Sequence, residues 1–150
     1  MKIICVGKLK EKYWCDAVAE YKKRLSKYTN LELIEVKDES FVEESKILEL
    51  EKAKIEKYLT EKDYIITLEI EGREQTSKEF SKKIEDILIE NSNIVFIIGG
   101  SLGLSEKIKK RANLHLSFSK MTFPHQLFRV MLLEQIYRSY KIMNNERYHK

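Results

Sequence analysis

The feature that most constrains the fold is an unbroken apolar run, Ile94–Ile98, which ends at two glycines. A strand that is apolar at every position is buried on both faces, and this is typical of a parallel sheet covered by helices. Other short apolar runs predict further strands along the chain. The five predicted strands are Lys2–Val6, Leu31–Val36, Tyr64–Leu68, Ile94–Ile98 and Leu114–Phe118.

The segments between these runs have the three- and four-residue spacing of apolar side chains that is typical of amphipathic helices. A capping-box pattern from Thr76 to Glu79 starts one of them, and Ser105 is expected to cap another. The predicted helices cover residues 14–28, 42–59, 77–88, 106–111 and 124–144. This order predicts one α/β domain over residues 1–150, with a mostly parallel sheet and helices on both of its faces.

The carboxyl ends of the strands are the expected place for a ligand, because open α/β sheets bind ligands there. These ends are Leu68, the glycine pair at 99 and 100, and residues 117–122. Three of the five glycines lie within residues 99–103, and the one proline, Pro124, precedes His125. Read alone, the glycine segment is also compatible with an ordinary strand-to-helix turn. It matches neither a phosphate-binding P-loop nor the dinucleotide-binding fingerprint.

Charge is distributed unevenly along the chain. Residues 101–150 hold ten basic and three acidic side chains, whereas residues 1–100 hold 18 basic and 21 acidic ones. The positive charge therefore lies in the same segment as the glycines and histidines, and it favours a polyanionic partner. A basic helix that is merely solvated is the alternative.

Other classes of protein are disfavoured by what the sequence lacks. There is no run of about 18 apolar residues and no secretory pattern at the start, so we expect no membrane span and a cytoplasmic location. Cys5 and Cys15 are expected to be free thiols in a reducing compartment. No spacing of histidines and cysteines indicates a metal site.

The glycine segment, the run Ser119–His125 and the ending Tyr148–Lys150 together resemble the SPOUT class of RNA methyltransferases. Within that class, the chain is similar over its whole length to the ribosomal large-subunit pseudouridine methyltransferases. The resemblance implies a C-terminal trefoil knot, S-adenosylmethionine as the cofactor in the knotted loops, and a homodimer. The cofactor contacts that it implies are Leu68, Gly100, Ser119, Lys120, Met121, Thr122, Phe123 and Pro124. A side chain at position 100 is expected to occupy the volume of the cofactor.

The resemblance also implies the reaction, which is methylation of N3 of a pseudouridine in 23S ribosomal RNA within the assembled ribosome. The terminal residues of the family fold over the active site, so Tyr148 and His149 are the catalytic candidates here. His149 is a candidate general base, with water or a phosphate oxygen as alternatives. Lys109, Lys110, Arg138 and Lys150 are candidate RNA contacts.

Two residues of the last third keep open roles. His125 could act as a base, a metal ligand or a hydrogen-bond donor at the start of a helix, and its position beside proline favours the last of these. Arg129 could serve the knot or the dimer, or it could be solvated. The dimer interface is expected on the apolar side of the last helix. The candidates for that interface are Leu127, Met131, Ile136 and Tyr140.

Two other functions compete with the methyltransferase. A non-catalytic module that binds RNA or the ribosome could share the fold, but the cofactor segments are intact in this sequence. A nucleotide- or flavin-binding domain would need a phosphate loop after the first strand. The loop there, residues 7–12, has a single glycine.

Overall fold

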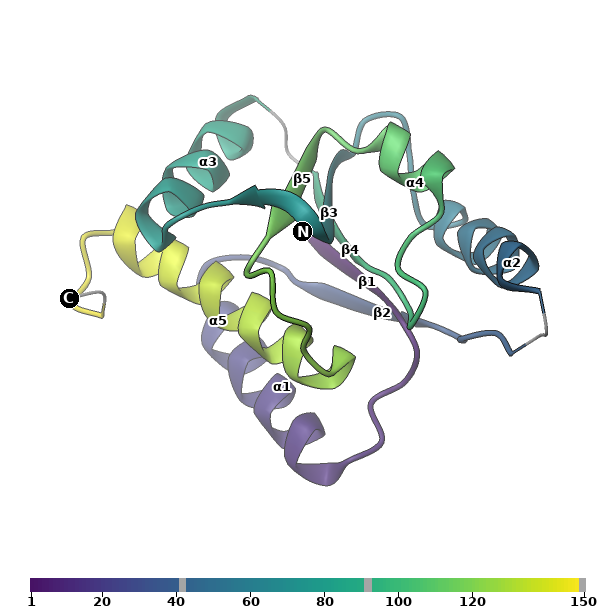
Figure 1. The fold of residues 1–150 in the computed structure, drawn as a ribbon. Helices are drawn as coiled ribbons and strands as arrows, with labels where there is room; N and C mark the ends of the chain where they lie inside the picture. The colour runs from purple at the N-terminus through teal and green to yellow at the C-terminus, as the bar shows by residue number, and fades with distance from the viewer. Residues whose placement is uncertain (41–42, 91–92, 149–150) are drawn as a thin grey trace.

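The computed structural model describes residues 1–40, 43–90 and 93–148. Within these ranges, five strands alternate with five helices (Figure 1). The strands are β1 (Lys2–Val6), β2 (Glu32–Val36), β3 (Tyr64–Glu74), β4 (Ile94–Ile98) and β5 (Leu114–Ser117). The helices are α1 (Lys12–Leu25), α2 (Glu44–Glu56), α3 (Ser77–Glu90), α4 (Glu106–Arg111) and α5 (His125–Met143).

The five strands form one parallel sheet in the order β2-β1-β4-β3-β5. β4 is the central strand, and it pairs with β1 on one side and β3 on the other. All five of its residues are buried, which explains why the sequence keeps every position apolar. The predicted α/β class and parallel sheet are confirmed.

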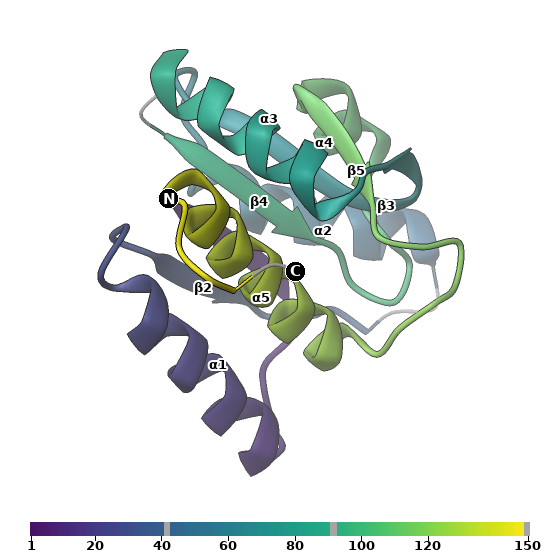
Figure 2. The same cartoon turned by 90° about the vertical axis from the view of Figure 1, so that its left-hand side faces the viewer.

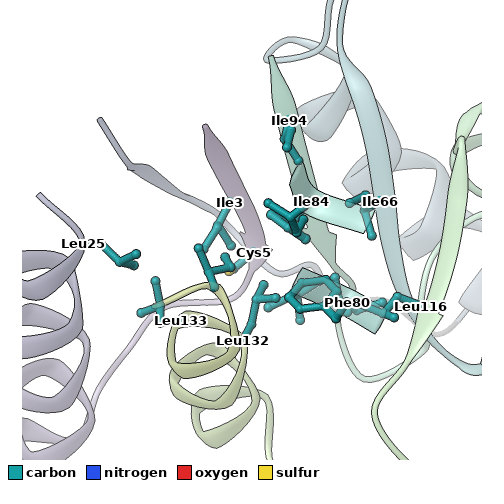
Figure 3. Close-up of a cluster of buried hydrophobic side chains, with 14 of the residues drawn as sticks. Ile3, Cys5, Leu25, Ile66, Phe80, Ile84, Ile94, Leu116, Leu132 and Leu133 are labelled. Atoms are coloured by element: carbon teal, nitrogen blue, oxygen red, sulfur yellow. The ribbon is translucent and has the colours of Figure 1, made fainter. Parts of the chain in front are cut away.

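Helices cover both faces of the sheet, as predicted. Ile3, Cys5, Phe96 and Ile98 point to one face, where they pack with α1, α3 and α5 (Figures 2 and 3). The alternate residues of the same strands point to the other face, where they pack with Ile55 of α2 and with Ile108 of α4. The knot that the resemblance implies stays a prediction.

β3 is longer than predicted, because it continues from Leu68 to Glu74. Four of residues 69–74 are charged, the one large apolar side chain, Ile70, is exposed, and no burial pattern marks the segment as a strand. The pairing with β5 shifts register between Leu68 and Arg73. Gly72 permits the close approach, since a Cβ there would lie 2.6 Å from the carbonyl carbon of Leu116. This extension carries polar side chains past the end of β4.

The expected dimer interface on α5 is wrong for two of its four residues. Ile136 is fully buried in the core, and Tyr140 is 8% exposed. The ring of Tyr140 stacks on that of Tyr28, with 5.4 Å between the ring centroids. Leu127 and Met131 are partly exposed and remain available for an interface.

Both cysteines are free, with Cys5 buried and Cys15 exposed. Burial raises the pKa of the Cys5 thiol to about 12, so it stays protonated at neutral pH. Within the three described ranges, no helix has the length and apolar character needed to span a membrane. No group of histidine, cysteine and carboxylate side chains in those ranges could hold a metal ion.

Candidate cofactor cavity

A cavity of about 470 Å³ opens at the carboxyl end of β4, beside the part of β3 that continues past it. Residues from three chain segments and the start of α5 line it. They are Leu68–Glu71, Ile98–Leu104 with Lys109, Phe118, Ser119 and Met121–Phe123, and His125 with Phe128. The edge of the sheet that was expected to bind a ligand therefore does form a cavity.

Six of the eight predicted cofactor contacts line this cavity. They are Leu68, Gly100, Ser119, Met121, Thr122 and Phe123. Lys120 and Pro124 belong to the same loop but do not line the cavity, and both are exposed. The two segments that were singled out in the sequence thus line the same cavity.

The glycine segment after β4 folds back on itself. The amide of Gly103 donates a hydrogen bond of 3.0 Å to the carbonyl of Gly100. A Cβ on Gly99 would overlap the backbone of Gly103, so the tight turn itself requires glycine there. Gly103 has a φ of +77°, a conformation that glycine adopts without strain.

The expected reason for glycine at position 100 is wrong. A Cβ at Gly100 would point into the protein, 3.1 Å from Cγ1 of Val6 and 3.2 Å from Oε2 of Glu51. A Cβ at Gly103 would meet no protein atom within 4 Å. Gly100 therefore contributes backbone to the cavity wall, and the open space faces Gly103.

Glu51 lies under this turn on α2 and is only 5% exposed. Its carboxylate accepts a hydrogen bond of 3.1 Å from the amide of Glu39. Burial raises the pKa of Glu51, while that hydrogen bond and the charge of Lys54 act in the opposite direction. The glycine turn thus rests on a buried carboxyl group, which leaves little room for a larger residue.

Another part of the cavity lining is an aromatic cluster, of which only Phe123 was expected from the sequence. Phe128 of α5 lies 5.0 Å from the ring of Phe118 and 6.4 Å from that of Phe123, measured between centroids. Ser119 shapes the loop between Phe118 and Phe123, because its hydroxyl accepts a hydrogen bond of 3.0 Å from the amide of Met121. Phe118 and Phe128 were missed because each also fits the apolar pattern of its own strand or helix.

His125 lies at the start of α5 and also lines the cavity. Burial is the largest cause that lowers its pKa, and the positive charge of Arg129 lowers it further. A hydrogen bond with the backbone of Gly99 acts in the opposite direction. His125 thus forms a hydrogen bond at the start of the helix, in line with the role that its position favoured. This bond connects α5 to the glycine segment.

Arg129 is neither solvated nor free for a partner, since it is 1% exposed. Its guanidinium donates to Oε1 of Glu35 at 2.6 Å and to the carbonyls of Val6 at 3.1 Å and Gly7 at 2.7 Å. These contacts join the first turns of α5 to the carboxyl ends of β1 and β2. Arg129 thereby fixes the element that carries His125 and Phe128.

A second polar group lies beside the cavity. Nδ1 of His115 on β5 is 2.7 Å from Oε1 of Glu69 and 3.2 Å from Oγ1 of Thr67. Glu69 and Glu71 line both the cavity and a neighbouring hollow of about 370 Å³. Sequence analysis did not find these two carboxylates, because the strand was expected to end at Leu68.

The candidate RNA contacts lie in different settings. Lys109 lines the cavity and forms an ion pair of 3.1 Å with Glu106, whereas Lys110 is exposed. Arg138 is bound to Glu134 of its own helix at 2.6 Å, so an RNA contact would require it to leave this partner or share it. Lys150 lies outside the described residues.

The tail as far as Tyr148 packs on α5 and does not line the cavity. The hydroxyl of Tyr148 donates to Oε1 of Glu134 at 3.1 Å, and Arg138 lies over its ring at 4.9 Å from the centroid. Burial and the neighbouring carboxylate of Glu134 raise the pKa of Tyr148 to about 12. His149, the other catalytic candidate, lies outside the described residues.

Comparison with known proteins gives one consistent result. The family model described as a predicted SPOUT methyltransferase matches residues 1–149. The chain is 60% identical over 155 aligned positions to a provisionally named ribosomal RNA large subunit methyltransferase H of Methanococcus vannielii, covering 99% of this chain and 98% of the relative. It is 54% identical to ribosomal RNA large subunit methyltransferase H 1 of Clostridium perfringens, with the same coverage.

Among solved structures, the chain is similar to a probable methylase family protein from Haemophilus influenzae. The TM-score is 0.60 at 14% identity, and the match covers 99% of this chain and 70% of the other. At this identity the similarity concerns the fold alone.

Proposed function

Because the chain belongs to the SPOUT methyltransferases, of the type named ribosomal RNA large subunit methyltransferase H, we propose that it methylates large-subunit ribosomal RNA with S-adenosylmethionine as methyl donor. The acceptor is N3 of a pseudouridine in 23S ribosomal RNA, and the substrate is the assembled ribosome in the cytoplasm. The observation that carries the proposal is that the whole-chain match coincides with a cavity built from the glycine segment and the Ser119–Phe123 loop.

The residues of the cavity fit this cofactor. Phe118, Phe123 and Leu68 supply apolar surface for a purine, and the turned backbone at residues 99–103 supplies polar groups that could fix its edge. Glu69 and Glu71 carry the charge opposite to that of a sulfonium. The apolar residues of the cavity therefore suit the purine of the cofactor, and the two carboxylates suit its positive charge.

The chemistry that the protein must supply is limited. S-adenosylmethionine brings an activated methyl group, so the chain needs to orient the acceptor and exclude water. N3 of a pseudouridine carries a proton at neutral pH, and a positioned base typically accelerates such a proton transfer by about 10²- to 10⁴-fold. We assign this role to His149, with Tyr148 beside it.

We propose a homodimer whose interface includes Leu127 and Met131, the two partly exposed residues of the candidate set. A specific interface should bury about 1,200–2,000 Å² in total. Light scattering at micromolar concentration should therefore report a mass of twice 17.9 kDa. An active monomer at that concentration would contradict the proposal.

The open space at Gly103 gives a direct test of the cofactor position. Gly103→Asn should weaken S-adenosylmethionine binding at least about tenfold, because asparagine tolerates a positive φ and its side chain would occupy open space at a position that lines the cavity. Calorimetric titration measures the affinity, and the melting temperature should change little.

Gly100→Ala is the matched control for that variant. Its added methyl group would press on Val6 and Glu51, so the main effect should be a loss of stability of about 1–3 kcal/mol. If Gly103→Asn binds the cofactor as the wild type does, the cofactor does not lie against the glycine turn.

The proposed reaction is tested by mapping ribosomal RNA methylation in cells with and without the gene. Loss of one N3-methylated pseudouridine, restored by the gene, is the expected result. Unchanged methylation together with ribosome binding would indicate a non-catalytic module. Titration with ATP and FMN beside S-adenosylmethionine tests the remaining alternative, a nucleotide- or flavin-binding domain.

A further inference from the structure

We propose that the loop after β1 and the first turn of α1 form a second RNA-binding surface, made by Lys8, Lys10 and Tyr13. We call these three residues the lysine–tyrosine patch. It would bind two phosphates of the RNA backbone and stack on one base. The proposal rests on the proposed function, because it names a further contact with the same RNA substrate.

The backbone of the loop is held in place. The amide of Leu9 donates to Oε1 of Glu35 at 2.8 Å, and the amide of Lys10 donates to Oε1 of Gln126 at 3.0 Å. The carbonyl of Gly7 accepts from Arg129 at 2.7 Å. Leu9 also packs against the core. The loop therefore presents its side chains from a fixed position.

The side chains of the two lysines point away from this anchored backbone. Lys8 and Lys10 are exposed, whereas Leu9 between them is partly buried. Within the part of the chain that the structure describes, neither lysine forms an ion pair. Lys12 is different, because it is paired with Asp16. Glu35, whose carboxylate holds the amide of Leu9, is already paired with Arg129, and the one carboxylate within the loop, Glu11, is exposed.

The patch lies at the same edge of the sheet as the cavity. Lys10 is bonded to Gln126, the residue that follows the cavity-lining His125. Figure 1 shows the loop leaving β1 and running past the first turns of α5. An RNA strand that reached the cavity could therefore extend onto this loop. Residues 1–100 hold more acidic than basic side chains, so the charge count of that segment did not indicate a basic loop within it.

Tyr13 adds an aromatic surface to the two charges. It is 61% exposed, and its ring centroid lies 4.9 Å from that of Trp14. Lysines bind phosphates without regard to sequence, and exposed aromatic rings stack on unpaired bases. An exposed ring in the helix turn that follows two unpaired lysines fits single-stranded RNA better than it fits an acidic protein surface, which would need no stacking.

The test compares two double variants that remove equal charge. Lys8→Gln with Lys10→Gln changes the patch, whereas Lys22→Gln with Lys23→Gln changes two exposed lysines in the last turn of α1. The second pair lies about 15 Å along the helix from Lys12, since the rise is about 1.5 Å per residue. Binding to isolated large ribosomal subunits and to ribosomes is measured over a range of salt concentrations.

The patch variant should bind more weakly at low salt, and its slope of log K against log salt should be shallower by roughly 1.4 to 1.8. This follows because each neutralised phosphate contributes about 0.7 to 0.9. The control pair should keep the wild-type slope. Tyr13→Ala should weaken binding roughly 5- to 150-fold, whereas Tyr13→Phe should keep it, because stacking needs the ring alone. S-adenosylmethionine affinity should be unchanged in all four variants.

Three results would overturn the proposal. An unchanged slope and affinity in the patch variant, with an active wild type, would assign the lysines to a solvated loop. Weaker binding with an unchanged slope would assign them to a ribosomal protein instead of phosphates. If the wild type neither binds nor methylates ribosomes, the proposed function itself fails, and the patch has no RNA to contact.

Discussion

Deletion of residues 148–150 is expected to lower the rate of ribosomal RNA methylation by orders of magnitude while S-adenosylmethionine binding is retained. The deletion removes both catalytic candidates, Tyr148 and His149. Tyr148 contacts Glu134 and Arg138 and does not line the cofactor cavity, so the cofactor should bind as before. Single-turnover methylation of ribosomes and calorimetric titration of the cofactor measure the two effects separately.

The stability of the truncated protein should fall only modestly. The truncated protein loses the contacts that Tyr148 makes: one aromatic contact with Tyr137, one cation–π contact with Arg138 and one hydrogen bond to Glu134. Such partly exposed contacts amount together to about 1–2 kcal/mol. The melting temperature should therefore drop by only a few degrees, which cannot account for a loss of activity at a temperature where the protein stays folded.

Two single variants separate the roles within the tail. His149→Ala should slow the reaction about 10²- to 10⁴-fold if the imidazole accepts the N3 proton. Tyr148→Phe keeps the ring contacts and removes only the hydroxyl that donates to Glu134. If the truncated protein methylates ribosomes at the wild-type rate, the tail has no catalytic part and the assignment of His149 must be withdrawn.

Much of the fold could be predicted because burial leaves a local signal. The apolar strands and the helix periodicity are properties of neighbouring residues, and they gave the five strands and five helices in the right order. Most of the predicted cofactor contacts also line the cavity, because strand ends in a parallel sheet meet at one edge. The polar end of β3 gave no such signal, so Glu69 and Glu71 were missed.

Other features depend on residues that are far apart in the chain. A side chain at position 100 would contact Val6 and Glu51, which lie far away in the sequence. No spacing within the glycine segment indicates these contacts. The burial of Ile136 and Tyr140 follows from how α5 sits against α1 and α3. An apolar residue on a helix predicts that this face of the helix is buried. It does not indicate whether the face packs against the same chain or against a second copy of it.

Arg129 is the clearest case of a long-range contact that periodicity misrepresents. In the sequence it is one cation on a basic helix, yet Glu35 is 94 residues away. The buried guanidinium satisfies two carbonyls at the end of β1 together with that carboxylate. Burial of a charge is costly unless such partners are present, and removal of one partner leaves the others without compensation.

Arg129→Ala is therefore expected to destabilise the protein by about 3–5 kcal/mol, which is typical of breaking a buried pair. For a chain of this size, the melting temperature should fall by about 6–20 °C. Arg24→Ala is the control, because Arg24 is far less buried than Arg129: it pairs with Glu20 and lies over the rings of Tyr21 and Tyr137, so its loss should destabilise the protein much less. Thermal and urea unfolding measure both variants.

Arg129 also holds the start of α5 and the β1 loop. S-adenosylmethionine affinity should therefore fall in Arg129→Ala even well below its melting temperature, while Arg24→Ala should bind the cofactor normally. Equal unfolding free energies for the two variants would show that the bonds to Val6, Gly7 and Glu35 do not stabilise this edge of the sheet.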